Sequence, residues 1–106
     1  MSEHVFDREA WVQRDIFYQM GNIGSEVGRA LSAKRRGNEK DMLAALYRGI
    51  DLMNTTIAGL IAQKSPRAKE VLRAREQFAE SILTSHTDPS LEKYFMEFAI
   101  AARRGL

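Results

Sequence analysis

The sequence of 106 residues has no cysteine, only two prolines and no long apolar run. Without cysteine the chain can form no disulfide, no thiolate metal site and no cysteine nucleophile, which fits a reducing compartment. No uncharged apolar stretch approaches the roughly 20 residues that cross a bilayer, and no basic segment followed by an apolar run marks a signal peptide. We therefore expect a cytoplasmic protein that has no membrane partner.

Motifs that carry catalysis or bind metals are also scarce. The two histidines, His4 and His86, fall in a predicted N-terminal arm and in a predicted loop, and no His-x-x-x-His or Glu-x-x-His pair occurs. A di-metal carboxylate site in a helical bundle needs such pairs. The glycines do not match a dinucleotide fingerprint, since their spacing differs and no strand precedes them. We therefore predict a protein that is not an enzyme and has no catalytic residue, metal or cofactor.

The composition is that of one ordinary globular domain over residues 1–106, with a short arm over residues 1–7. Hydrophobic residues make up 44% and charged residues 28% of the chain, and both fractions are typical of globular proteins. A chain of this length forms a single domain. The formal net charge of +2 permits an acidic partner without indicating one.

Apolar spacing predicts the first two helices. Residues 8–36 form one helix, because apolar side chains recur there every three or four residues, at Val12, Ile16, Met20, Ile23, Val27 and Ala30. Residues 39–63 form the next helix on the same rhythm, at Leu43, Leu46, Ile50, Met53, Ile57 and Leu60. Gly37 and Asn38 are placed to end the first helix and to cap the second.

The two prolines mark the starts of two further helices. Ser65-Pro66 and Asp88-Pro89 each place a capping residue before a proline at the first helical position. This signal predicts helices over residues 66–84 and 89–104. No segment alternates with the period of a strand. Because the links between the four helices are short, we expect an all-α, up-down antiparallel four-helix bundle.

Three glycines, Gly21, Gly24 and Gly28, lie within the first predicted helix. Each glycine costs the interior of a helix about 1 kcal/mol relative to alanine. Gly24 and Gly28 are four residues apart, which is the spacing of close helix packing. We therefore expect another helix, from the same chain or from a second one, to press against this flank. A ligand held against the backbone is the alternative.

Two pairs of large apolar side chains point away from the predicted core. Trp11 and Tyr18 are seven residues apart on the outer face of the first helix, and Met96 and Ile100 are four apart on the outer face of the last. Paired exposed apolar residues at helical spacing indicate a contact surface. We therefore predict a homo-oligomer, with a dimer favoured, and a protein partner whose identity the sequence does not give.

Arg75 is the charged residue placed most deeply in an apolar arc, between Val71 and Phe78. An arginine at such a position must pair or extend to solvent. Two interpretations stay open. Arg75 either reaches out or forms a structural ion pair, or it binds an anion in a pocket with Asn54 and Tyr47 as neighbours.

Basic residues gather at the ends of the predicted helices, at Lys34, Arg35, Arg36, Arg103 and Arg104. Cations stabilise the C-terminal ends of helices through the helix dipole. RNA binding is the alternative interpretation, although no aromatic residues are interleaved with these patches.

Three segments carry a resemblance: QMGNIGSEVGRAL (19–31), YRGIDLMNTTI (47–57) and LEKYFMEFAIAARR (91–104). They resemble a group of small prokaryotic helical proteins with no established activity, and the resemblance covers residues 17–56 and 91–104. Size and architecture are more distantly similar to HEPN-type bundles and to bundles encoded by ribosomal RNA intervening sequences. HEPN ribonucleases use an arginine that four to six intervening residues separate from a histidine, but Ala79, Glu80 and Ser81 occupy these positions before His86 here. The resemblance therefore implies a fold, and leaves open the role of a catalytically silent partner.

The leading hypothesis is a non-enzymatic, self-associating helical bundle that acts as a protein-interaction module. The missing catalytic motifs, the glycine flank and the outward apolar pairs motivate it. The alternatives are an RNA-binding bundle that uses its basic helix ends and a small bundle that binds an anion or another ligand.

Overall fold

The computed structural model describes residues 6–86 and 89–103, except for the side chains of residues 102 and 103. Within these ranges the chain forms five helices and no strand. The helices are α1 (Arg8–Gln13), α2 (Ile16–Arg35), α3 (Glu39–Ala62), α4 (Arg67–Leu83) and α5 (Pro89–Arg103). The prediction of an all-α protein is therefore confirmed. Every helix in this part of the chain is too short or too polar to cross a membrane.

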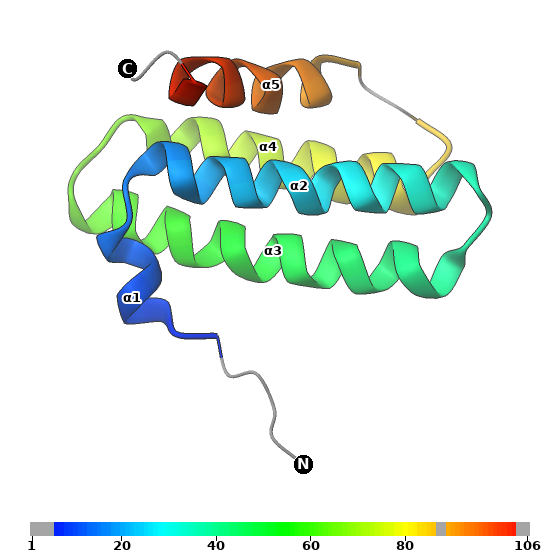
Figure 1. Cartoon of the computed structure of the whole chain (residues 1–106), viewed down its shortest axis with the longest axis horizontal. Helices are drawn as coiled ribbons and strands as arrows, with labels where there is room; N and C mark the ends of the chain where they lie inside the picture. Colours follow the sequence, from blue (N-terminus) through cyan, green and yellow to red (C-terminus); the bar gives the residue numbers. More distant parts are fainter. Residues whose placement is uncertain (1–5, 87–88, 104–106) are drawn as a thin grey trace.

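The long helices α2, α3 and α4 run side by side in alternating directions, and α5 lies along the opposite side of α2 from α3 (Figure 1). The most extensive contact is between α2 and α3, and α4 packs chiefly on α3. Helix α5 packs chiefly on α2 and touches α4 only sparingly. The short α1 packs on α3. The core therefore lies among α2, α3 and α4, with α5 covering one side of it.

The predicted single helix over residues 8–36 is wrong, because the chain breaks it into α1 and α2. The backbone is extended at Arg14, with ψ of 154°, and at Asp15, with ψ of 164°. The Asp15 side chain accepts a hydrogen bond of 2.8 Å from the backbone N–H of Tyr18, so it caps α2. Asp7 caps α1 in the same way. Two aspartates at N-cap positions therefore start two helices where apolar spacing alone indicates one.

The predicted capping signals are confirmed at Gly37 and Asn38, whereas α4 begins one residue later than predicted, with Pro66 instead of Ser65 at the N-cap. Gly37 has a φ of +72°, a left-handed conformation that glycine adopts at low cost after a helix. The Asn38 side chain accepts a hydrogen bond from the backbone N–H of Asp41 and caps α3. The Ser65 hydroxyl accepts from the N–H of Arg67 at 3.2 Å. The predicted capping residue Asp88 lies outside the described residues.

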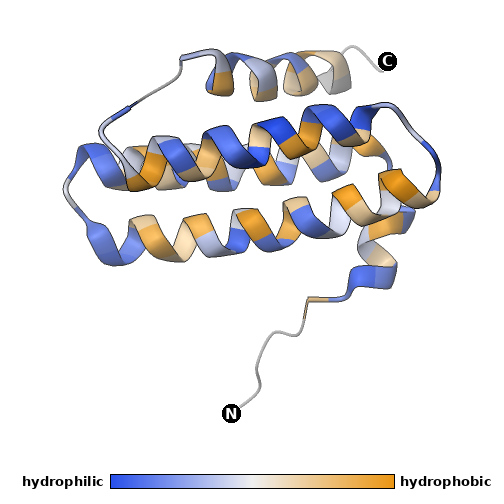
Figure 2. Cartoon of the chain, turned by 180° about the vertical axis from the view of Figure 1, so that it is seen from behind, coloured by the Kyte–Doolittle hydropathy of each residue, from blue (hydrophilic) through white to orange (hydrophobic). Residues whose placement is uncertain are grey.

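The core consists of the apolar faces that the helical spacing predicts, and polar faces alternate with them along the ribbons (Figure 2). The largest apolar side chains that are less than 2% exposed come from α2 to α5; they are Met20, Ile23, Val27, Met53, Val71, Phe78 and Leu91. Gly49 lets α3 approach α4, because a Cβ at this position would lie 2.7 Å from Cε2 of Phe78. Large residues and one glycine therefore interlock across the centre of the domain.

Candidate functional site

The three glycines of α2 divide into one covered position and two open ones. A Cβ built on Gly24 would lie 3.1 Å from the Cβ of Phe95 on α5, so α5 packs closely over Gly24. A Cβ on Gly21 or Gly28 would meet no heavy atom within 4 Å among the described residues. No described residue therefore packs against these two glycines as expected, and α2 keeps an open strip of backbone beside α5.

The exposed apolar side chain of Met96, on α5, borders this strip. Met96 is 59% exposed and Ile100 is 40% exposed, and their spacing of four residues places them on the same side of α5. Met96 lines a shallow hollow of about 310 Å³ together with Gly21 and Gly28. We call the surface formed by Gly21, Gly28, Met96 and Ile100 the α2–α5 face. It joins four of the residues that the sequence assigns to helix packing or an interface.

Trp11 lies elsewhere, and its predicted outward position is wrong. Its side chain is 7% exposed, and its indole N–H donates a hydrogen bond of 2.8 Å to the hydroxyl of Thr56 on α3. That hydroxyl donates to the Gln19 side chain, which in turn donates to the carbonyl of Arg14. The break before α2 lets α1 turn Trp11 toward α3. Tyr18, on α2, is 40% exposed, as expected for an outward residue.

Arg75 reaches out of the apolar arc of α4. Its guanidinium donates a hydrogen bond of 2.6 Å to the side-chain oxygen of Asn54 on α3, at an exposed position. Tyr47 is 66% exposed, and no contact joins it to Arg75 in the part of the chain described. The geometry therefore matches an arginine that extends to the surface and bonds to an amide.

The basic cluster at the end of α2 is partly used within the chain. The Lys34 ammonium donates to the carbonyl oxygens of Ser81 and Thr84 at the C-terminal end of α4. Arg35 lies 4.0 Å from the carboxylate of Glu92 on α5. The Arg36 side chain is exposed and forms no hydrogen bond or ion pair with a described residue.

The other proposed nucleic-acid contacts, Arg103 and Arg104, lie at the C-terminal end of the chain. The side chain of Arg103 and the whole of Arg104 lie outside the described residues. Arg36 is therefore the one member of the predicted basic set that offers a guanidinium without a partner in the described structure.

A charged cluster between α2 and α3 has no counterpart in the sequence prediction. The Glu26 side chain is 11% exposed and accepts two hydrogen bonds from Arg48, of 2.9 Å from Nε and 3.3 Å from Nη2. Arg29 donates a third, of 3.1 Å. The hydrogen bond between Arg48 and Glu26 raises the pKa of Arg48 above the ordinary arginine value. The signal in the sequence is that Glu26 borders the apolar arc of Ile23 and Ala30 on a helical wheel.

Beside this cluster runs a groove of about 530 Å³ between α2 and α3. We call it the arginine groove, because Arg29, Arg36 and Arg48 line it. Its other lining residues are small, apart from Asp41; they are Ser25, Gly28, Ser32, Ala44 and Ala45. Asp41 accepts a hydrogen bond of 2.8 Å from the Asn38 side chain. The groove therefore has arginines along its walls and small residues along its floor, which leave space for a ligand.

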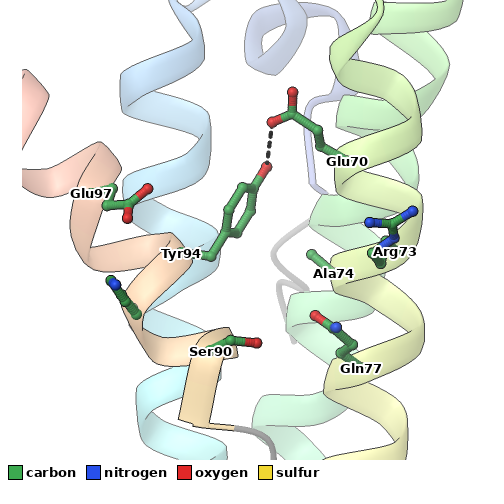
Figure 3. Close-up of a pocket in the computed structure, with 8 residues that line it drawn as sticks. Glu70, Arg73, Ala74, Gln77, Ser90, Tyr94 and Glu97 are labelled. Atoms are coloured by element: carbon green, nitrogen blue, oxygen red, sulfur yellow. Dashed lines mark hydrogen bonds between the residues drawn. The ribbon is translucent and has the colours of Figure 1, made fainter.

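A second groove, of about 400 Å³, separates α4 from α5, and Figure 3 shows Tyr94 and Glu70 facing each other across it. The Tyr94 hydroxyl donates to Glu70 at 3.4 Å. Burial, assisted by the negative charge of Glu70, raises the pKa of Tyr94 to about 12. Tyr94 therefore stays neutral at neutral pH and cannot act as a base there. No cluster of three metal-binding side chains occurs among the residues described.

Comparisons of the chain with known proteins found no relative. No family model, curated protein or solved structure matches the chain.

Proposed function

We propose that this chain is a non-enzymatic interaction module that self-associates through the α2–α5 face, with a dimer as the favoured assembly. In this proposal α2 to α5 act as an up-down four-helix bundle and α1 is an added short helix. One observation carries it: α2 keeps Gly21 and Gly28 open beside the exposed side chain of Met96. Each open glycine costs the helix about 1 kcal/mol relative to alanine, and no packing by the described residues offsets that cost.

The shape of the face supports helix-to-helix docking. Gly21, Ser25 and Gly28 follow one another at steps of four and three residues, so small side chains line one edge of α2. A helix from a second chain can therefore approach the α2 backbone closely. Met96 supplies apolar area at the edge of this contact. A dimer with two-fold symmetry uses the same face on both chains, so no second binding surface is needed.

The test is whether each of two alanine substitutions raises or lowers stability. In an isolated chain, Gly21→Ala and Gly28→Ala should each stabilise the helix by about 0.5–1 kcal/mol. In a dimer the added methyl groups push the second chain away. We expect sedimentation to show a wild-type dimer and a weaker dimer for each variant. The melting temperature of each variant should exceed that of the wild type only at dilutions where both are monomeric.

A charge substitution supplies the matched control. Met96→Glu should abolish the dimer and leave the melting temperature of the monomer nearly unchanged, because the side chain is largely exposed. Ile61→Glu changes an equally exposed residue, at 58%, on α3 and should leave the dimer intact. A wild-type protein that stays monomeric at all concentrations, or two glutamate variants that behave alike, would rule out the proposal.

A further inference from the structure

We propose that the arginine groove between α2 and α3 binds the phosphate group of a small phosphorylated ligand. This site shares Gly28 with the α2–α5 face, but its three arginines lie outside that face, and ligand binding does not require self-association. Three features of the groove support a phosphate ligand: the buried Glu26, the three arginines that line it, and the size and chemistry of its floor.

The first step is that Glu26 organises two guanidinium groups before any ligand arrives. Arg29 and Arg48 both donate to the same carboxylate oxygen, at 3.1 and 3.3 Å, and Arg48 also grips the second oxygen at 2.9 Å. The two arginine side chains remain 63% and 55% exposed, so their other N–H groups are open to solvent. Holding these flexible side chains in place lowers the entropy that ligand binding would otherwise cost.

The second step is that Arg36 adds a cation without a partner. It follows Arg29 by seven residues and is the C-cap residue of α2, with a helical backbone conformation, so both lie on the same side of the helix. The three arginines outnumber the two nearby carboxylates, Glu26 and Asp41. The excess positive charge favours an anion in the groove. Guanidinium groups match the geometry of phosphate oxygens by donating two parallel hydrogen bonds.

The third step concerns the floor, which selects for a compact polar ligand. No aromatic or large apolar side chain lines the groove, so it offers no surface on which a nucleic-acid base could stack. The open Gly28 leaves space beside the backbone, where a phosphate oxygen can approach. A volume of about 530 Å³ holds a small phosphorylated molecule, and pockets of this size are typical of such ligands.

The experiment titrates the full chain with inorganic phosphate and, in parallel, with a sugar phosphate, at constant ionic strength. Amide spectra of uniformly labelled protein report the site, and the Met96→Glu background keeps the result independent of dimer formation. We expect saturable shifts at Gly28, Ser32 and the Nε–H of Arg48. Tighter binding of the sugar phosphate identifies an organic phosphate as the ligand, and equal binding identifies free phosphate.

Two substitutions decide whether the groove is the site. Arg36→Gln should weaken phosphate binding about tenfold, because one charged hydrogen bond is lost, and should leave the melting temperature unchanged. Arg73→Gln makes the same charge change at an exposed position on α4 and should leave affinity unchanged. Equal losses for the two variants, or shifts that never saturate, would overturn the proposal. So would tighter binding of a ten-nucleotide RNA with a steep salt dependence, since the ligand would then be a nucleic-acid backbone.

Discussion

The ion cluster at Glu26 shows how the exposure of each partner sets the cost of losing the other. Glu26 is 11% exposed, whereas Arg29 and Arg48 are more than half exposed. A charge that stays buried after its partner is removed is costly, whereas an exposed charge regains its hydration. The cluster was missed in the sequence because a lone glutamate at the edge of an apolar arc is usually solvated. Its partner Arg48 lies on another helix.

We predict an order of stabilities from this asymmetry. Arg48→Met leaves the buried carboxylate with one arginine and should lower the free energy of unfolding by about 1–2 kcal/mol. Glu26→Gln leaves two arginines that water can hydrate, and should cost less. Urea unfolding of the two variants measures the difference. A larger loss for Glu26→Gln than for Arg48→Met would contradict the argument.

Ser81 offers a stabilising substitution in the core. The residue is 1% exposed, and its hydroxyl oxygen has no hydrogen-bond partner in the described part of the chain. Ser81→Ala removes this unpaired polar atom and should raise the free energy of unfolding by about 1 kcal/mol. Ser25→Ala, at an exposed position of α2, shares the gain in helix propensity without the burial. Both variants are measured in the Met96→Glu background, because Ser25 lines the hollow at the α2–α5 face. A gain at Ser81 no larger than that at Ser25 would refute the prediction.

At the scale of helices, the break between α1 and α2 depends on one capping residue. In a continuous helix over residues 8–36, Asp15→Ala would stabilise the protein, because alanine has the higher helix propensity. In the observed structure the substitution removes the N-cap of α2 and should cost about 1 kcal/mol. Asp15→Asn keeps the cap and should cost little. Thermal melts of both variants distinguish the two structures. A higher melting temperature for Asp15→Ala than for the wild type would favour a single continuous helix.

The contact between α4 and α5 should weaken in alkali. Tyrosine ionises near pH 10 in an unfolded chain, whereas Tyr94 ionises at about 12 in the folded protein. Because the unfolded state loses this proton first, stability is retained below pH 10 and falls as the pH rises toward 12. Tyr94→Phe should reduce that fall in melting temperature. The exposed Tyr47→Phe should follow the wild type, and identical curves for all three proteins would speak against the prediction.

Across the whole molecule, local sequence signals predicted where the helices lie in the chain better than which helices pack together. Apolar spacing and caps such as Gly37-Asn38 act within a few residues, so the sequence located α3, α4 and α5 closely. The packing of α5 on α2 in preference to α4 depends on distant partners, such as Phe95 over Gly24. Of the candidate site, the open glycines and Met96 were named from the sequence. The arginine groove was not, because its walls come from two helices.

The uneven packing of α5 gives a prediction for the whole domain. Leu91, Phe95 and Phe98 are the buried side chains described on α5, and the helix packs chiefly on α2. Helix α3 packs on both α2 and α4 and also contacts α1. Native-state hydrogen exchange should therefore show α5 amides opening at a lower free energy than α3 amides. Uniform protection across both helices would mean that the domain opens only as one unit.

Trp11 is the single tryptophan of the chain, so it alone accounts for the tryptophan fluorescence of the protein. Its fluorescence comes from one site, where the indole is buried and bonded to Thr56. A red shift in emission therefore marks the release of α1 from α3. Neither the α2–α5 face nor the arginine groove includes this indole. Tryptophan emission thus provides an internal reference signal that should hold steady while partners and anions are titrated at the other two surfaces.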